Sequence, residues 1–415
     1  PTKALLKSAQ VYDYINHAAD YGIEVKEAKH DFGKVIKRSR DVAGGMSKGV
    51  QFLMKKNKIQ IIEGFGKIKS KGVVEVDKDG NKKIIEAQNI ILATGARERE
   101  LPFMKIDGEK IVGYHDAMVL PSQPKKLVVV GSGAIGMEFA YFYQKMGTEV
   151  TIIEYLDRLL PNEDEDISKT MFKIYKKYGV NVMTNAEVKA VDKNSDGVEV
   201  SIETKKGQQT IQADIVLSAV GVQTNLENLG LEEMGIQMDK GRIIVNQHYQ
   251  TNVKGIYAIG DITPGPALAH VASAEGIICV EAIAGKNPES MDYNNIPSCT
   301  YCLPEVASVG LTEKQATEQG YEIKVGKFPF SASGKAKAAG VSEGFVKVIF
   351  DAKYGEWLGA HMIGANVTEM IAEAVTARKL ETTGHEIIKA VHPHPTMSEA
   401  VMEATAAAYD EVIHL

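Results

Sequence analysis

The spacing of hydrophobic and polar residues changes along the chain, and each spacing predicts a type of secondary structure. From residue 2 to about residue 57, apolar and charged positions alternate at helical spacing, which predicts two or three helices. After them, short apolar runs bounded by turn residues predict strands at residues 59–62, 73–76 and 83–86. The run Ile90-Ile91-Leu92-Ala93-Thr94-Gly95 has the pattern of a fully apolar strand that runs into a tight glycine turn, and it predicts a buried parallel strand.

A complete βαβ unit follows, with a glycine-rich turn between its first strand and its helix. Residues 126–130 and 149–153 predict buried strands, and residues 137–146 predict the helix between them. The turn reads Gly131-Ser132-Gly133-Ala134-Ile135-Gly136. In this G-x-G-x-x-G pattern the first glycine makes the turn, the second lets the backbone approach a pyrophosphate at the helix N-terminus, and the third packs the helix on the strand.

An acidic residue at the end of the second strand makes this pattern more specific. Glu154 follows the turn at the spacing of about 20 residues where a carboxylate accepts hydrogen bonds from the ribose 2′-hydroxyl and repels a 2′-phosphate. A tight turn without a ligand is the alternative interpretation, but it leaves Glu154 unexplained. The sequence therefore predicts a dinucleotide site that prefers NAD to NADP.

The next part of the chain again shows predicted strands followed by glycine turns. Strands are predicted at residues 180–182, 198–202 and 211–216. Residues 219–221 resemble residues 93–95, since in both segments a strand ends and the chain continues into a glycine turn. A buried strand at residues 255–260 ends at Asp261, and an acid at that place faces the ligand crevice of an open α/β sheet. A helix is expected from about Val271. The repetition suggests two similar nucleotide-binding domains.

The pattern changes again after residue 287. Strands are predicted near residues 298–302, 306–311, 322–328 and 345–350, and a helix near residues 369–378. This order indicates an α+β module, separate from the α/β units before it.

Length and charge limit the classes of function. A chain of 415 residues is too long for one ordinary core, so we expect two to four domains. The net charge of -6 and the pI near 6.0 indicate neither nucleic acid nor an anionic membrane as partner. No apolar run reaches the roughly 18 residues that a membrane span requires.

The three cysteines, Cys279, Cys299 and Cys302, are too few for a disulfide scaffold and indicate a reducing compartment. Cys299 and Cys302 match a C-x-x-C pattern within a predicted strand region. Because residues three apart on a strand point to opposite faces, we interpret this match as incidental.

The segment His392-Pro393-His394-Pro395-Thr396-Met397-Ser398-Glu399 places an imidazole five residues before a carboxylate. An imidazole with a pKa of about 6.5 moves protons near neutral pH, and a carboxylate on its other nitrogen would fix its tautomer. Two alternatives stay open. Thr396 and Glu399 match a capping box, with Thr396 as the N-cap of a helix. Histidines also bind metals, although His392 and His394 do not lie one helical turn apart.

Four motifs in a fixed order give the chain a family resemblance over essentially its whole length. They are the glycine turn at residues 131–136, Tyr257-Ala258-Ile259-Gly260-Asp261, Pro304-Glu305-Val306-Ala307-Ser308-Val309-Gly310 and His394-Pro395-Thr396. With these motifs the chain resembles the two-dinucleotide flavoprotein disulfide reductases. Within that family it is most similar to the dihydrolipoamide dehydrogenases, to which residues 359–365 and the tail through Ala400 also correspond.

The resemblance implies an α/β fold with two Rossmann-like dinucleotide-binding domains, for FAD and NAD, followed by an α+β dimerisation domain. The expected bounds are 1–118 and 244–290 for the FAD domain, 119–243 for the NAD domain and 291–415 for the dimerisation domain. The implied reaction oxidises protein-bound dihydrolipoamide with NAD⁺ as acceptor, through an enzyme disulfide and FAD.

The resemblance also implies partners and a location. The chain would form a homodimer and would act on the lipoyl domain of a 2-oxo acid dehydrogenase complex or of the glycine cleavage system. Neither nucleic acid nor a membrane is an expected partner. The compartment would be the bacterial cytoplasm, or the mitochondrial matrix in a eukaryote.

Individual roles follow from the same resemblance. His394, oriented by Glu399, would be the acid/base and would act across the homodimer interface, while Lys3 and Glu138 would form an ion pair beside the isoalloxazine. The FAD site would further include Gly66, Thr94, Gly95, Ala96, Asp261, Ala267, Leu268, Ala269 and His270. The NAD site would include Gly131, Gly133, Gly136, Glu138, Glu154, Val188 and Gly221. No metal is expected.

The sequence departs from the family pattern in two places. In the family, a C-x-x-x-x-C redox pair and the strand, turn and helix that bind the FAD pyrophosphate precede the segment that resembles residues 1–3. This sequence holds neither and begins without an initiator methionine or targeting segment, so we expect a chain shortened at its N-terminus. Gly221 is followed by Val222, where many members have arginine.

Two further hypotheses accommodate the missing cysteine pair. The chain could be an NAD-binding, dimerising fragment without activity. Alternatively, it could be a diaphorase that passes electrons from NADH to dyes without any thiol.

Overall fold

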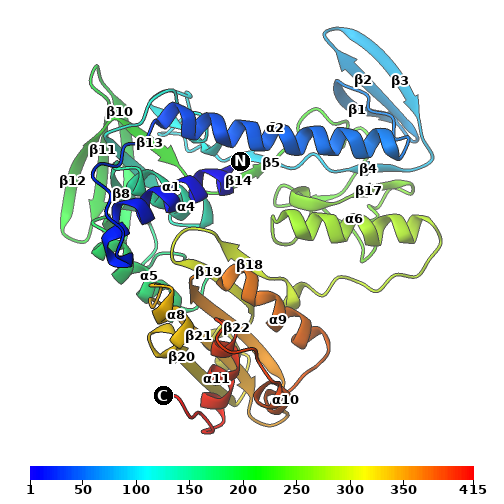
Figure 1. Ribbon diagram of the computed structural model, residues 1–415. Helices are drawn as coiled ribbons and strands as arrows, with labels where there is room; N and C mark the ends of the chain where they lie inside the picture. Colours follow the sequence, from blue (N-terminus) through cyan, green and yellow to red (C-terminus); the bar gives the residue numbers. More distant parts are fainter. The chain divides into compact units, whose positions relative to one another are not determined.

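The computed structural model describes residues 1–415, and its contacts divide the chain into two compact units (Figure 1). Unit 1 comprises Pro1–Gly44, Arg99–Gly221 and Asn294–Leu415, and unit 2 comprises Gly45–Glu98 and Val222–Tyr293. Each unit is therefore assembled from segments that lie far apart in the sequence.

Two long helices occupy the N-terminal region, as the helical spacing predicts. The first of them buries Leu5, Leu6 and Ala9 and packs against the helix of the βαβ unit. These residues belong to the largest core cluster of unit 1. The N-terminal elements are α1 (Thr2–Asn16), the short 3₁₀ helix η1 (Ala18–Tyr21) and α2 (Phe32–Lys56).

A parallel five-stranded sheet lies at the centre of unit 1, in the order β6-β13-β7-β8-β9. Helix α4 follows β7, and β8 pairs with β7 in parallel, which confirms the predicted βαβ unit. The elements of this layer are α3 (Tyr114–Ala117), α4 (Ala134–Lys145), α5 (Glu165–Lys177), β6 (Ile111–Val112), β7 (Lys126–Val130), β8 (Glu149–Ile153), β9 (Asn181–Met183) and β13 (Ile215–Ser218).

An antiparallel sheet of β10 (Ala186–Lys193), β11 (Val198–Thr204) and β12 (Gly207–Ala213) precedes the last of these strands. The prediction of one strand at residues 211–216 was wrong, because the chain leaves the antiparallel sheet at Ala213 and enters the parallel sheet at Ile215. The carboxylate of Asp214 accepts hydrogen bonds from the backbone N–H groups of Lys125 (2.6 Å) and Lys126 (2.9 Å) and fixes this crossing.

A second five-stranded sheet, antiparallel, fills the C-terminal part of unit 1 in the order β18-β19-β22-β21-β20. Helix α9 packs on β19 and β22, and α11 packs on β20 and β21 (Figure 1). The predicted strands are present, and β22 is an additional one. The elements are β18 (Ser298–Thr300), β19 (Glu305–Gly310), β20 (Ile323–Pro329), β21 (Phe345–Asp351), β22 (Trp357–Gly364), η4 (Phe330–Ala332), α7 (Glu313–Glu318), α8 (Gly334–Ala338), α9 (Val367–Lys379), α10 (Gly384–Lys389) and α11 (Glu399–Ala408).

Unit 2 contains small sheets and one long helix. Its parallel pair β4 and β17 joins residues near 90 to residues near 257. The elements are β1 (Phe65–Ser70), β2 (Val73–Lys78), β3 (Asn81–Glu86), β4 (Ile90–Leu92), β5 (Ala96–Glu98), β14 (Val222–Thr224), β15 (Met238–Asp239), β16 (Arg242–Ile243), β17 (Ile256–Ala258), η2 (Gly260–Ile262) and α6 (Ala269–Ile283). The short helix η3 (Tyr293–Asn295) begins at the last residue of unit 2 and continues into unit 1.

The strand predicted at residues 59–62 was wrong. Ile59 and Ile61 are 52% and 59% exposed, and no strand pairs with this segment. An apolar run becomes a strand only where a neighbour supplies hydrogen bonds, and here the ladder starts at Phe65, opposite Asp77.

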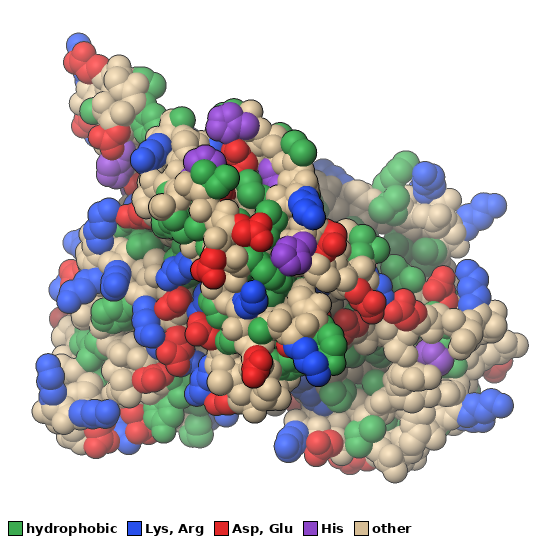
Figure 2. All heavy atoms as spheres, turned by 90° about the horizontal axis from the view of Figure 1, so that it is seen from below, with side chains coloured by type: hydrophobic (Ala, Val, Ile, Leu, Met, Phe, Trp, Pro, Cys, Tyr) green, Lys and Arg blue, Asp and Glu red, His purple; other side chains and the backbone are tan.

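Charged side chains of both signs are interspersed over the face shown in Figure 2. That face therefore presents no extended area of a single charge that would attract a polyanion. None of the helices has both the length and the apolar character that crossing a membrane requires.

Candidate functional site

The carboxyl ends of three neighbouring strands of unit 1, β13, β7 and β8, meet at one edge of the parallel sheet. The glycine turn follows β7, Glu154 follows β8, and Gly221 lies just beyond β13 with a φ of +106°. Ligands of open α/β sheets bind outside the carboxyl ends of the strands. The structure thus brings together residues that the sequence assigns to the nucleotide.

The glycines of the turn meet different packing requirements. Gly131 has a φ of +100°, and a Cβ there would lie 2.4 Å from the carbonyl oxygen of Ala219. A Cβ on Gly136 would lie 2.0 Å from the carbonyl oxygen of Gly131. By contrast, no atom lies within 4 Å of the Cβ position of Gly133, which is the N-cap residue of α4. Open backbone at a helix N-terminus fits a pyrophosphate.

Glu154 is held rigidly beside this turn. One carboxylate oxygen accepts hydrogen bonds from the backbone N–H (2.9 Å) and the hydroxyl (2.7 Å) of Ser132, and the other accepts one from the N–H of Leu156 (2.8 Å). The residue is only 7% exposed. The carboxylate is therefore oriented before any ribose hydroxyl reaches it.

Val188, on β10, is buried in a core cluster that also contains Val130 and Ile153, the last residues of β7 and β8. It supports the strand ends beneath the nucleotide turn by packing.

Lys3 and Glu138 form an ion pair, as the resemblance implies. Nζ of Lys3 lies 2.9 Å from both carboxylate oxygens of Glu138, which is 6% exposed. Tyr301 completes the group, because its backbone N–H donates to Glu138 (3.1 Å) and its ring lies 4.2 Å from Nζ of Lys3. Sequence reasoning missed the contact of Tyr301 with Glu138, because Tyr301 follows a short strand more than 160 residues beyond Glu138.

In unit 2, the carboxyl ends of β4 and β17 carry the residues assigned to FAD. After β4, the hydroxyl of Thr94 donates to the carbonyl oxygen of Asn225 (2.6 Å), and Gly95 adopts a φ of +66° with no atom within 4 Å of its Cβ position. After β17, Asp261 lies in the helical turn η2. The two strands are adjacent and parallel, so these residues share one edge of the sheet.

A residue that the sequence did not single out holds the turn at Asp261. The carboxylate of Glu275, on α6, accepts hydrogen bonds from the backbone N–H of Gly260 (2.6 Å) and the hydroxyl of Tyr293 (2.7 Å). Glu275 is 1% exposed, and the Tyr293 oxygen lies 3.1 Å from the Tyr249 oxygen. This buried network fixes the turn next to Asp261.

The other residues assigned to FAD lie on several elements of unit 2. Gly66 lies on β1, opposite Val76, and Ala96 begins β5, opposite Thr224. Leu268 is the N-cap of α6, which begins at Ala269. Ala267, Ala269 and His270 are exposed around this helix start.

The structure brings His394 and Glu399 of unit 1 into contact. Nδ1 of His394 lies 2.9 Å from Oε1 of Glu399, and the His394 side chain is 79% exposed. Burial acts to raise the pKa of Glu399, but hydrogen bonds from the Thr396 N–H and from His394 outweigh it and hold this pKa below its ordinary value. A separate pair joins Nε2 of His392 to Glu373 at 2.7 Å.

The capping box predicted at Thr396 was wrong in part. Glu399 does accept a hydrogen bond from the Thr396 N–H (2.8 Å), but Glu399 is the first residue of α11 and Ser398 is its N-cap. The Thr396 hydroxyl donates backwards to the carbonyl oxygen of Pro393 (2.8 Å). Glu399 therefore links the helix start to the segment that carries His394.

The cysteines are free and unactivated. Burial raises the pKa of Cys299 to about 11 and that of Cys302 to about 12. Sγ of Cys302 donates to the carbonyl oxygen of Pro304. No group of three or more His, Cys, Asp or Glu side chains is arranged to hold a metal ion.

Two family models match the chain one after the other. The family described as "Pyridine nucleotide-disulphide oxidoreductase" matches residues 1–276, and the dimerisation domain of the same family matches residues 296–405.

Curated relatives named dihydrolipoyl dehydrogenase are similar over the whole chain. The relative from Zymomonas mobilis is 46% identical, and the one from Rhizobium etli is 47% identical; each match covers 100% of this chain and 90% of the relative. A mitochondrial relative from Arabidopsis thaliana is 40% identical over 100% of this chain and 83% of its own length.

Solved structures agree in fold. LpdA from Mycobacterium tuberculosis superposes with a TM-score of 0.91 at 27% identity, covering 98% of this chain and 88% of LpdA. The HOCl-induced flavoprotein disulfide reductase RclA from Escherichia coli gives a TM-score of 0.85 at 26% identity, covering 98% and 89%.

These similarities confirm the predicted fold class, with two Rossmann-like dinucleotide-binding domains and an α+β dimerisation domain. The chain is an oxidoreductase whose cofactors are FAD and NAD. It belongs to the pyridine nucleotide-disulphide oxidoreductase family.

Proposed function

We propose that the protein catalyses the dihydrolipoyl dehydrogenase reaction, in which a protein-bound dihydrolipoyl group is oxidised and NAD⁺ is reduced. The observation that carries this proposal is the hydrogen-bonded pair of His394 and Glu399, which suits the exchange of a proton with a thiol. Full-length similarity to two relatives of that name, at 46% and 47% identity, supports it.

His394 would handle the protons of this reaction. Closing the dithiol to a disulfide releases two electrons and two protons; NAD⁺ takes both electrons with one proton as hydride, and the other proton leaves to solvent. Because Glu399 holds Nδ1, the exposed Nε2 is the nitrogen that takes the thiol proton. The carboxylate then stabilises the imidazolium that forms.

The nucleotide would bind at the carboxyl edge of the parallel sheet. The open backbone at Gly133 would receive the pyrophosphate, and the oriented carboxylate of Glu154 would accept hydrogen bonds from the ribose hydroxyls. The same carboxylate would repel a 2′-phosphate, so NAD⁺ is the proposed acceptor.

FAD would bind the residues that the family resemblance assigns to it. Thr94, Gly95 and Asp261 of unit 2 would contact it, with Gly66, Ala96 and residues 267–270 completing the set. The resemblance assigns the ion pair of Lys3 and Glu138 to the isoalloxazine ring, and in this pair the two charges hold each other in place. When bound, FAD supplies the two-electron transfer between the dithiol and NAD⁺.

No residue of this sequence is assigned to the enzyme dithiol. The chain holds only three cysteines and no C-x-x-x-x-C pair. Burial raises the pKa of each of their thiols to about 11 or 12, which disfavours thiolate chemistry. Assays of the reaction therefore use the protein expressed from the complete reading frame that contains this sequence.

The proposed partners are a second copy of the chain and a lipoyl domain. The match to the dimerisation domain supports a homodimer, and in that dimer the exposed His394 would serve the other subunit's active site. The bacterial relatives are more similar to this chain than the mitochondrial one, which favours a bacterial cytoplasm.

Steady-state rates with a panel of substrates test the proposal. We expect NAD⁺ reduction with dihydrolipoamide, and at most slow turnover with NADP⁺. Reduction of glutathione disulfide by NADPH without turnover of dihydrolipoamide would contradict the proposal. Reduction of dyes by NADH with no thiol turnover would instead favour a diaphorase.

A further inference from the structure

A polar row crosses the face of the C-terminal sheet that lies opposite α9 and α11. Ser308 on β19 pairs in register with His361 on β22, His361 with Lys347 on β21, and Lys347 with Lys327 on β20. Register partners point to the same face of a sheet, so these side chains form a line. Their neighbours in sequence, such as Val346 and Met362, point to the other face and belong to its apolar core.

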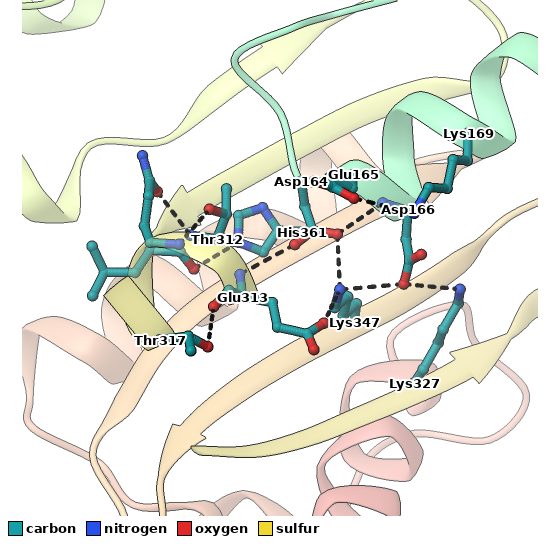
Figure 3. Close-up of polar contacts among 12 residues, drawn as sticks. Asp164, Glu165, Asp166, Lys169, Thr312, Glu313, Thr317, Lys327, Lys347 and His361 are labelled. Atoms are coloured by element: carbon teal, nitrogen blue, oxygen red, sulfur yellow. Dashed lines mark hydrogen bonds and ion pairs between the residues drawn. The ribbon is translucent and has the colours of Figure 1, made fainter. Parts of the chain in front are cut away.

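Acidic residues from the start of α5 lie over this row (Figure 3). Nζ of Lys347 lies 2.8 Å from Asp164, 3.2 Å from Asp166 and 2.6 Å from Glu313 of α7. Asp164 also caps α5 by accepting from the Asp166 N–H (3.0 Å), and its second oxygen accepts from the Glu313 N–H (3.2 Å). Three carboxylates thus converge on one ammonium group.

The central ion pair of this cluster, between Lys347 and Asp164, is buried. The side chains of Lys347 and Asp164 are 3% and 2% exposed. Burial acts to lower the pKa of Lys347, but its ion pairs with Asp164 and Glu313 outweigh that effect and raise it, so the amine stays charged. Apolar residues often stabilise a core as well as a buried ion pair does, so stability alone does not account for this arrangement.

The cluster connects to the nucleotide turn through a strained residue. Leu160 has a φ of +47°, a left-handed conformation that is strained for a leucine. Its N–H donates to the carbonyl oxygen of Ser132 (3.2 Å), inside the glycine turn. Its carbonyl oxygen accepts from the Glu163 N–H (2.9 Å) and the Ser168 hydroxyl (3.3 Å), on both sides of Asp164. Such strain persists only where the surroundings enforce it.

We propose that Lys347 is a positioning residue for the nucleotide site: it anchors the start of α5 and, through Leu160, holds the peptide of Ser132 in place for the pyrophosphate. The inference rests on the NAD site within the proposed function but not on the dihydrolipoyl substrate. An amine of the dimerisation module would then set nucleotide affinity in the neighbouring module without touching the nucleotide.

Direct titration of NADH and NADPH onto the purified protein, followed by nucleotide fluorescence, tests this role. For Lys347→Met we expect both dissociation constants to rise by the same factor, on the order of fivefold, because the turn serves the pyrophosphate that the two nucleotides share. If Lys347 served stability alone, the variant would have a lower melting temperature, but its dissociation constants for NADH and NADPH in the folded state would not rise by a common factor. In steady state, KM for NAD⁺ should rise while kcat changes less than twofold.

Two further variants make the test decisive. Lys327→Met is the matched control, because Lys327 lies in the same row but is 44% exposed, pairs with a single carboxylate, Asp166, and lies over the ring of Phe345; its nucleotide affinities should equal those of the wild type. Asp164→Asn keeps an N-cap side chain but removes the charge, and it replaces Lys347→Met if that variant does not fold. This variant should weaken the binding of NADH and of NADPH about twofold each. Wild-type nucleotide affinities in the folded variant would overturn the inference, whereas failure to oxidise dihydrolipoamide would bear only on the proposed substrate.

Discussion

Nδ1 of His394 lies 2.9 Å from Oε1 of Glu399, while the other oxygen of this carboxylate accepts a hydrogen bond from the Thr396 N–H at 2.8 Å. The carboxylate therefore fixes the imidazole and the backbone that carries it at the same time. This geometry leaves Nε2 as the nitrogen that exchanges protons with a substrate.

His394→Gln should remove proton transfer and leave nucleotide binding intact. General acid–base catalysis contributes typically 100-fold to 10,000-fold, so kcat for dihydrolipoamide oxidation should fall within that range. NADH affinity, measured by fluorescence, should not change. His392→Gln is the matched control, since His392 pairs with a different carboxylate, Glu373, and its kcat should stay close to that of the wild type.

Glu154→Gln should reduce the preference for NAD⁺ over NADP⁺. A hydrogen bond to a charged group contributes about 1.5–3 kcal/mol, so KM for NAD⁺ should rise roughly 10-fold to 100-fold, and KM for NADP⁺ should fall as the repulsion is lost. Glu149→Gln, at the exposed start of the same strand, should leave both values unchanged. An unaltered ratio of the two KM values in the Glu154 variant would refute this role.

Glu275→Leu should weaken FAD binding by way of the turn at Asp261. The substitution leaves the N–H of Gly260 without its buried acceptor, which costs about 1–3 kcal/mol, and we expect FAD affinity to fall about tenfold or more. The measurement is the ratio of flavin to protein after gel filtration. Glu281→Leu on the same helix, 41% exposed, should retain the wild-type ratio.

Glu163 should make stability depend on pH. Burial raises the pKa of this 9% exposed carboxyl from 4.5 to about 7, aided by the charge of Asp164 and opposed by a hydrogen bond from Ser308. Because the folded state binds this proton more tightly than the unfolded state does, the contribution is present below pH 4.5 and is lost as the pH rises through about 7.

Urea unfolding of wild type and Glu163→Gln measures this effect. The variant should gain up to about 3 kcal/mol relative to the wild type as the pH rises from about 5 to about 8, since a tenfold change in proton affinity corresponds to about 1.4 kcal/mol. Glu165→Gln, 47% exposed, should follow the wild type. A constant difference between Glu163→Gln and the wild type would show that Glu163 does not titrate in this range.

Local pattern was sufficient to predict the βαβ unit and its glycine turn. Each of its strands is a continuous apolar run, and the turn between β7 and α4 is defined by residues adjacent in sequence. The apolar run at residues 59–62 misled because a strand needs a partner, which the run itself does not specify. The prediction of one strand at residues 211–216 failed for a related reason. The chain breaks at Asp214 because the residues before it join the antiparallel sheet and those after it join the parallel sheet.

The parts of the site that the sequence did not reveal are contacts between distant segments. Lys347 lies in a strand whose residues are all buried, so its neighbours in sequence do not indicate three acidic partners. The contact of Tyr301 with Glu138, and that of Glu275 with Gly260, likewise join different elements. His394 and Glu399 were recognisable because Glu399 lies only five positions after His394.

Anaerobic mixing of the flavin-loaded protein, expressed from the complete reading frame, tests the central claim most directly. We predict that dihydrolipoamide abolishes the absorbance of the oxidised flavin and that NAD⁺ then restores it with formation of NADH. A flavin that stays oxidised in dihydrolipoamide, or that is reoxidised by NADP⁺ but not by NAD⁺, would contradict the proposed function.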